Sequence, residues 1–269
     1  MFRPSAFFLS VGLIFAVPLS AEAQDGQHFW SGDWYLKVGA TGFIGPKYDG
    51  GSDRLFQAAP LISFGRAGST VRFSSRNDNP AFAFVDQGAF RAGVAGKLIF
   101  ERDEDTSSDL KGLDPVRFGG ELGGFAEVYP TDWLRIRAEL RQGIRSHHGL
   151  VADVAADGFV DVSDNVRLSA GPRLSAATSD YFDAYYGVSS SEAAKSGYSK
   201  YTPSGGIGSV GAGAAITWKA TEKLDTSAFV EYKRLMGPAA DSSIVNEGGS
   251  RNQLLFGLAA TYRFDFSLD

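Results

Sequence analysis

Cysteine is absent from the 269-residue sequence, and histidine and methionine are scarce, with three and two residues. The absence of cysteine excludes disulfide bonds, metal-thiolate sites, thiol catalysis and a lipid-modified amino-terminal cysteine. Positive charge is also in short supply, because the formal net charge is −5. A nucleic-acid-binding domain normally carries a basic patch or stripe, so we expect no nucleic-acid partner.

Long apolar runs are scarce as well. One run covers residues 7–19; it follows Arg3 and precedes Ala21-Glu22-Ala23, which has the small-residue pattern of a signal-peptide cleavage site. The run is too short for a membrane-spanning helix, and Pro18 interrupts it. We therefore predict that residues 1–23 are a cleaved signal peptide.

The mature domain, residues 24–269, contains no run of about 20 apolar residues, the length that a membrane helix requires. In a membrane it would have to be a closed β-barrel, since only helices and closed barrels satisfy every backbone polar group in lipid. The sequence has 33 glycines, 21 phenylalanines and 10 tyrosines, which suits a sheet protein with many turns and aromatic belts. A large secreted β-sandwich shares this composition, so the strand lengths must decide.

The stretch 117–142 predicts two long strands. Its second half alternates strictly between apolar and charged residues, and Pro130-Thr131-Asp132 predicts a turn between the halves. Each arm has about ten residues or more, against about 5–6 for an ordinary soluble strand. Strands of this length with one apolar face can cross a bilayer at a tilt.

Connections between the expected strands alternate between tight and long. The tight ones are residues 66–69, 130–133, 163–165 and 221–223, and the long ones are residues 45–54, 102–115, 178–204 and 236–252. This asymmetry is typical of outer-membrane barrels. We predict an antiparallel transmembrane β-barrel of twelve strands, with short periplasmic turns and longer extracellular loops. Ten strands is the alternative, if the weak segments 70–75 and 81–85 are loop.

Charged residues on one face of these strands must point into the barrel, because an arginine or lysine on the lipid face costs roughly 2–4 kcal/mol at mid-membrane. The predicted lumen-lining charges are Arg135, Arg137, Glu139, Arg141, Asp153, Asp157, Arg167 and Arg173. Symmetric hairpins would place Glu127 opposite Arg135, Glu121 opposite Arg141, Arg141 opposite Asp153, Arg137 opposite Asp157 and Asp161 opposite Arg167. We favour a structural charge ladder over a conduction path or binding lumen, because paired charges project less field into a pore.

Catalytic chemistry finds little support. His147 and His148 fall at a turn, where we expect solvated loop residues, and Ser146 points to the opposite face from His147. The acidic residues near 103–109 and 49–53 do not have the spacing of a calcium loop. We predict no catalytic residues, no metal, no cofactor and no enzymatic activity.

The longest loop is rich in tyrosine. Rigid amphipathic side chains of this kind are enriched at recognition surfaces. The recognition candidates are Tyr181, Tyr185, Tyr186, Tyr198 and Tyr201. The alternative is that these side chains fold over the barrel mouth or join the aromatic girdle.

Several short motifs, in order along most of the mature chain, resemble the MipA/OmpV family. They are Pro46-x-Tyr48-x-Gly50-Gly51-Ser52, Tyr185-Tyr186-Gly187-Val188, Glu192-Ala193, Ser196-Gly197-Tyr198, the run from Tyr232 to Ile244, Gln253, and Tyr262-Arg263-Phe264. Each motif is weak by itself, and the order carries the resemblance. The chain departs from the family in continuing past Phe264 to Asp269.

The resemblance implies a non-enzymatic barrel in the outer membrane of a Gram-negative bacterium, in contact with outer-membrane lipid. It implies a scaffold for murein-processing enzymes of the cell envelope, with a lytic transglycosylase and a murein synthase as partners. A narrow, porin-like channel for small polar solutes and an adhesin acting through the extracellular loops are the alternatives. The sequence does not give the oligomeric state.

Overall fold

Long antiparallel strands form nearly the whole molecule. The computed structural model describes residues 15–16, 31–66 and 73–268. The strands are β2 Gly32–Pro46, β3 Arg54–Arg66, β4 Ala81–Asp86, β5 Phe90–Ile99, β6 Gly119–Thr131, β7 Leu134–Ile144, β8 Leu150–Ser163, β9 Val166–Ala177, β10 Gly206–Lys219, β11 Leu224–Leu235 and β12 Asn252–Leu268. A further two-residue strand, β1, covers Phe15–Ala16.

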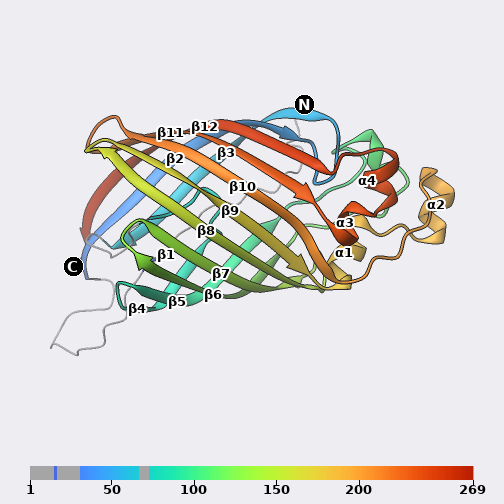
Figure 1. Ribbon diagram of the computed structural model, residues 1–269, viewed down its shortest axis with the longest axis horizontal. Coiled ribbons are helices and arrows are strands. Elements are labelled where there is room, and N and C mark those ends of the chain that lie inside the picture. Colours follow the sequence, from blue (N-terminus) through green and yellow to red (C-terminus); the bar gives the residue numbers. More distant parts are fainter. Residues whose placement is uncertain (1–14, 17–30, 67–72, 269) are drawn as a thin grey trace.

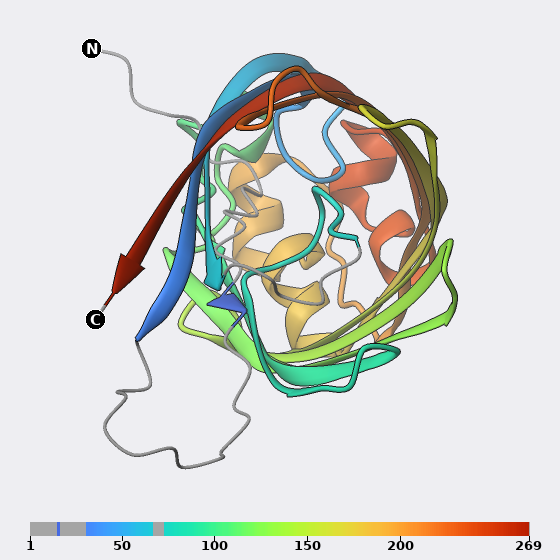
Figure 2. The ribbon, with the colours of Figure 1, turned by 90° about the vertical axis from the view of Figure 1, so that its left-hand side faces the viewer.

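Strand pairing runs around the molecule as a barrel (Figures 1 and 2). The eleven antiparallel strands of the described residues follow one another from β3 through β2 and β12 down to β4. Within that part of the chain β3 and β4 do not pair directly, and the ring is completed by β1, which is parallel to both. The predicted all-β antiparallel barrel is confirmed, but without β1, which lies in the predicted signal peptide, the eleven-strand sheet of the described residues is not closed between β3 and β4.

The strand number differs from both predicted values, twelve and ten, for a local reason. In the expected strand 70–75, residues 70–72 lie outside the described residues, and residues 73–75 form no strand but turn into the barrel. The strand β1 falls within the predicted signal peptide. The other residues of that segment lie outside the described residues. Its cleavage therefore stays a prediction.

The two ends of the barrel differ sharply (Figure 1). At one end, here the turn end, short connections join β4 to β5, β6 to β7, β8 to β9 and β10 to β11. At the other, the cap end, long connections carry the helices η1 Ser108–Leu110, α1 Ser179–Tyr186, α2 Ser190–Ser196, α3 Gly237–Ala240 and α4 Ser243–Glu247. The predicted alternation of tight and long connections is confirmed, except at residues 66–69, which extend beyond the described part.

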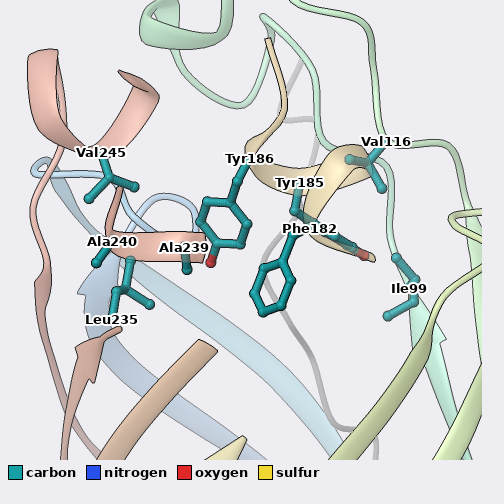
Figure 3. Packing of buried hydrophobic residues seen from close by; sticks show 9 residues of the cluster. All are labelled: Ile99, Val116, Phe182, Tyr185, Tyr186, Leu235, Ala239, Ala240 and Val245. Atoms are coloured by element: carbon teal, nitrogen blue, oxygen red, sulfur yellow. The ribbon is translucent and has the colours of Figure 1, made fainter. Parts of the chain in front are cut away.

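A small apolar core holds the cap helices over the barrel mouth (Figure 3). Its buried members are Ile99, Val116, Phe182, Tyr185, Tyr186, Leu235, Ala239, Ala240 and Val245. Local sequence explains the helices: Ser189 and Glu192 form a capping box at the start of α2, and Pro238 occupies the first turn of α3. The long loops are thus a folded lid, called here the cap.

The outer wall is apolar. On β7 the burial alternates residue by residue, with the charged side chains inside and Ile136, Ala138 and Leu140 outside. Exposed aromatic side chains gather near both ends: Phe84, Phe90, Trp133, Trp218, Tyr262 and Phe264 toward the turn end, and Phe56, Phe100, Phe118, Tyr232 and Phe256 toward the cap end. Two aromatic belts around an apolar band are typical of membrane barrels. Among the described residues no helix is long and apolar enough to span a bilayer.

The carboxyl-terminal residues continue the last strand. Strand β12 pairs with β2 as far as Leu268, opposite Gly32. The extension beyond Phe264 is therefore part of the barrel wall.

Candidate functional site: the barrel lumen

The inward charges of β5 to β8 form one continuous ladder. Arg137 donates to Glu127 at 2.9 Å and to Glu139 at 2.9 Å, and Arg141 donates to Glu121 at 2.8 Å. Arg141 also contacts Glu139, and Arg91 contacts Glu127, which joins these pairs end to end. Because each carboxylate lies between cations, the ladder holds its charges out of bulk water without leaving one unmatched.

All eight predicted lumen charges point inward. Their partners are Asp78, Asp157 and Glu127 for Arg135, Glu127 and Glu139 for Arg137, Glu121, Glu139 and Asp153 for Arg141, Asp161 for Arg167, and Asp157 for Arg173. Their burial varies: Arg135 and Arg141 are 1% exposed, whereas the side chains of Arg167 and Asp153 are 31% and 37% exposed.

The predicted cross-strand register is wrong in two of three hairpins. Glu127 lies opposite Arg137, not Arg135, since a register shift occurs between Val128 and Thr131. Between β7 and β8, Arg135 rather than Arg137 lies opposite Asp157. Both shifts equal two residues, so every side chain keeps its face. Asp161 opposite Arg167 is confirmed.

Side chains also pair diagonally, which preserves three of the expected contacts, one of them between Arg135 and Glu127 at 3.7 Å. Arg141 lies opposite Val151 and Gly123 in the backbone register. Its guanidinium nevertheless reaches Glu121 at 2.8 Å and Asp153 at 2.5 Å. Long side chains reach diagonal neighbours in this way.

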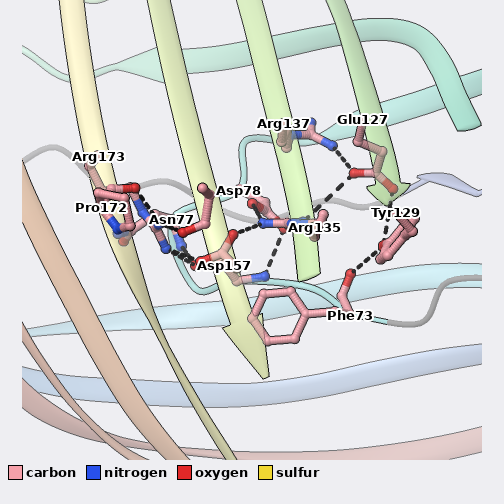
Figure 4. A network of polar contacts seen from close by, with 12 residues as sticks. Phe73, Asn77, Asp78, Glu127, Tyr129, Arg135, Arg137, Asp157, Pro172 and Arg173 are labelled. Carbon is pink, nitrogen blue, oxygen red and sulfur yellow. Dashed lines mark hydrogen bonds and ion pairs between the residues drawn. The ribbon is translucent and has the colours of Figure 1, made fainter. Parts of the chain in front are cut away.

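Residues 73–80 cross the lumen and are called the strap (Figure 2). On one side Asp78 accepts two hydrogen bonds from Arg135, at 2.6 and 2.8 Å (Figure 4). On the same side Asn79 donates to Glu139 at 2.7 Å. On the other side Arg76 lies 3.3 Å from Glu231 of β11. The strap therefore links two parts of the wall that are four strands apart in the barrel.

Aromatic contacts also hold the strap, at Phe73 and at Arg76. The ring of Phe73 stacks on Phe159 of β8 with a centroid distance of 4.8 Å. The Arg76 guanidinium lies 4.2 Å from the ring centroid of Phe229 and 5.7 Å from that of Phe43. Cation–π contacts of this kind favour a fixed arginine.

The strap divides the lumen into two chambers. A chamber of about 500 Å³ lies toward the turn end, and one of about 310 Å³ lies beneath the cap. Four residues line both chambers and so form the partition: Arg76, Asp78, Arg173 and Glu231. Sequence reasoning missed the strap, because it placed residues 70–75 in the wall.

The loop tyrosines differ in burial. Tyr185 and Tyr186 are 2% exposed and belong to the cap core, and Tyr181 packs against it. Tyr198 and Tyr201 pack against a second cluster around Tyr48 and remain partly accessible. Three of the five recognition candidates therefore pack in or against the cap core. A role in recognition for the five tyrosines stays a proposal.

Asp49 anchors the cap to the wall. Tyr186 donates to one of its carboxylate oxygens at 3.1 Å, and Lys233 of β11 donates to the other at 2.5 Å. Burial alone would raise the pKa of Asp49, but the nearby Lys233 ammonium and these two hydrogen bonds hold that pKa below its ordinary value.

The expectation that His147 is solvated is wrong. The residue is 3% exposed, accepts a hydrogen bond from the Gly149 backbone N–H at Nδ1, and has Nε2 3.2 Å from Glu121. Its ring meets Tyr181 edge-on at 5.0 Å. His147 therefore connects the charge ladder to the cap, while His148 is exposed as expected.

The arrangement offers paired charges rather than reactive ones. The ring nitrogens of His147 contact the Gly149 backbone N–H and the Glu121 carboxylate rather than a serine hydroxyl. In the described part of the chain no group of three or more histidine and acidic residues could hold a metal ion. The lumen therefore offers paired polar side chains, and the strap and the cap obstruct it.

The family described as MltA-interacting protein MipA matches residues 38–264. This chain belongs to that family. No curated protein matches the sequence. The MipA-family chain is similar in structure to Pseudomonas putida OprB at high pH, with 14% identity, 68% of this chain and 47% of that chain covered, and a TM-score of 0.38. It is also similar to a bacterial polysaccharide outer membrane secretin (9% identity, 87% and 99% covered, TM-score 0.41) and to outer-membrane expressed OmpT of Vibrio cholerae (7% identity, 90% and 100% covered, TM-score 0.39).

Proposed function

We propose that this protein is a non-enzymatic barrel of the Gram-negative outer membrane that acts as a scaffold for murein-processing enzymes. The apolar outer wall with its two aromatic belts supports the membrane location. The family takes its name from interaction with MltA, and the proposed partners are a lytic transglycosylase and a murein synthase.

The observation that carries the choice is the obstructed lumen. The strap crosses it, the cap covers one mouth, and the wall charges are bonded to one another. Open pores conduct through a continuous water path lined by available charges. A barrel closed in this way favours a function at its ends over one through its middle.

The turn end is the proposed partner surface, since short turns face the periplasm in barrels of this kind. Asp164 and Glu222 are exposed there, in the β8–β9 and β10–β11 turns. They are the acidic positions at which a partner would be most sensitive to charge reversal.

The test is retention of the refolded barrel on beads carrying a purified lytic transglycosylase. We expect retention at low salt, and a loss of about tenfold or more in the variant D164K/E222K. The matched control is Glu104→Lys, an exposed acidic position at the cap end. No retention of the folded wild-type barrel, or an equal loss in the control, would overturn the scaffold proposal.

The adhesin alternative has less support from the geometry. Adhesion through the tyrosine-rich loop needs exposed aromatic rings, whereas Tyr185 and Tyr186 are buried in the cap core. The partly accessible pair Tyr198 and Tyr201 remains for such a role.

A further inference from the structure

The chamber beneath the cap has the dimensions of a small-molecule site. Its volume is about 310 Å³, at the lower end of the range of about 300–1,000 Å³ that is usual for ligand pockets. The strap residues Asn77 and Asn79 form one side, and Tyr181, Phe182 and Tyr186 of α1 form the side toward the cap. Polar wall and aromatic cover meet around one enclosed space.

The charges lining this chamber balance. The cations are Arg76, Lys97, Arg137, Arg173 and Lys233, and the carboxylates are Asp49, Asp78, Glu139, Asp153 and Glu231, five of each. Ion pairs join Arg76 to Glu231, Arg137 to Glu139 and Lys233 to Asp49. A solute with a net charge would add an unmatched charge to this balanced set, which is unfavourable.

Hydrogen-bonding capacity remains available within these pairs. The side chains of Asp153 and Lys233 are 37% and 39% exposed, so water reaches them. A carboxylate accepts at about four positions and an ammonium has three donors, whereas Arg141 occupies one oxygen of Asp153 and Asp49 accepts one hydrogen bond from Lys233. Both can therefore bond a solute that carries several hydroxyl groups.

Two buried amides belong to the wall of the chamber. Asn79 and Gln253 line the same chamber and are 6% and 4% exposed. Their NH2 groups are bonded, to Glu139 and to the Ser250 carbonyl oxygen, which fixes their orientation. Their carbonyl oxygens have no hydrogen-bond partner among the described residues, and buried acceptors are normally satisfied. These oxygens have almost no accessible surface, so the amides shape the chamber wall rather than contact a solute in it.

We propose that the chamber beneath the cap binds a small neutral polyhydroxylated solute of monosaccharide size. Hydroxyl groups bond to Asp153 and Lys233, and the apolar face of the solute packs against Tyr181, the partly accessible tyrosine of α1 that lines the chamber. The balanced charge of the lining side chains favours a neutral solute, and the chamber volume of about 310 Å³ limits its size. The site requires no partner enzyme, so it stands or falls independently of the scaffold function.

The experiment compares three probes that share a carbon skeleton: glucose, gluconate and glucosamine. Calorimetric titration of the refolded wild-type barrel in detergent should show saturable binding of glucose, with gluconate and glucosamine about tenfold weaker or worse. Absence of saturable glucose binding to the folded barrel would overturn the proposal. Tighter binding of either charged probe would overturn the neutral class.

Two matched variants locate the site. Ala155 lines the chamber and lies opposite the inward Arg137, whereas Ala138, on the neighbouring strand, faces outward. Ala155→Phe fills the chamber and should abolish glucose binding, while Ala138→Phe adds the same ring to the lipid face and should leave it unchanged. Equal glucose binding in both folded variants would overturn the assignment.

A second variant covers the case in which Ala155→Phe does not refold. Asp153→Asn removes the charged acceptor at an accessible position and should weaken glucose binding about fivefold or more. Unchanged glucose affinity in folded Asp153→Asn would count against the proposed contacts.

Discussion

Asp78 on the strap and Arg135 on β7 face each other as a two-point ion pair, with both carboxylate oxygens within 2.8 Å of guanidinium nitrogens. Arg135 is 1% exposed and also bonds Asp157 at 2.7 Å. A planar guanidinium held on both sides in this way has a single orientation. The strap is therefore part of the barrel's charge balance and not only a filler of space.

Replacing Asp78 by Asn should destabilise the barrel by about 1.5–3 kcal/mol, because a buried hydrogen bond between charged groups is weakened. The measurement is the free energy of unfolding in urea with the barrel in lipid vesicles. The control is Asp161→Asn, which removes the carboxylate from an ion pair whose acid is 58% exposed and should cost about 0–1 kcal/mol. Equal losses in the two variants would contradict a special role for the strap pair.

The wall of the barrel was predictable because its signal is periodic. Inward and outward residues on a strand repeat every second position, so a register error of two residues, as at Glu127, changes the partner and not the face. The eight lumen charges could therefore be found without knowing the register.

The strap and the cap were not predictable in the same way. Asp78 and Asn79 meet their partners 57 and 60 residues away in the sequence, and residues 73–80 have no periodic pattern that marks an inward path. The burial of His147 was equally hard to predict, because it depends on Glu121 and on Tyr181, which belong to distant segments. Contacts of this kind depend on the closed barrel and leave no local trace in the sequence.

The strap should also control ion flow. In planar bilayers the wild-type barrel should show no or very small conductance steps, because the partition blocks the lumen. The double variant R76A/D78A removes the ion pairs of the strap with Glu231 and Arg135, and should give steps at least about threefold larger. Lys47→Ala, which breaks an exposed ion pair with Asp53 at the cap end, is the control. Large wild-type steps that R76A/D78A does not change would contradict closure by the strap.

Acid should loosen the cap through Asp49. Since the folded-state pKa lies below the ordinary value of 3.8, the carboxylate contributes stability above that value, and the contribution is lost as the pH falls through the folded-state pKa. Above pH 4 the variant Asp49→Asn should be less stable than the wild type by about 1–3 kcal/mol. The difference should shrink toward zero in strong acid.

Unfolding free energies of both proteins between pH 2 and pH 8 would check this prediction. Asp53→Asn is the control, since that carboxylate is 58% exposed and its loss should cost about 0–1 kcal/mol. A difference between wild type and Asp49→Asn that stays constant down to pH 2 would show that Asp49 does not act as a charged anchor.

The lipid-facing wall makes a prediction that depends on depth. Leu140, near the middle of β7, and Val160, near the turn end of β8, are 55% and 54% exposed, so an arginine at either position has similar room in the barrel itself. In a bilayer Leu140→Arg should cost about 2–4 kcal/mol and Val160→Arg about 0–1 kcal/mol, because the cost of a charge falls from the midplane to the interface. Unfolding in lipid vesicles measures both values. Equal costs would mean that the band between the aromatic belts does not lie in lipid, whereas the expected difference would place the bilayer midplane near Leu140 and leave the turn end at the membrane surface, where a periplasmic partner could reach it.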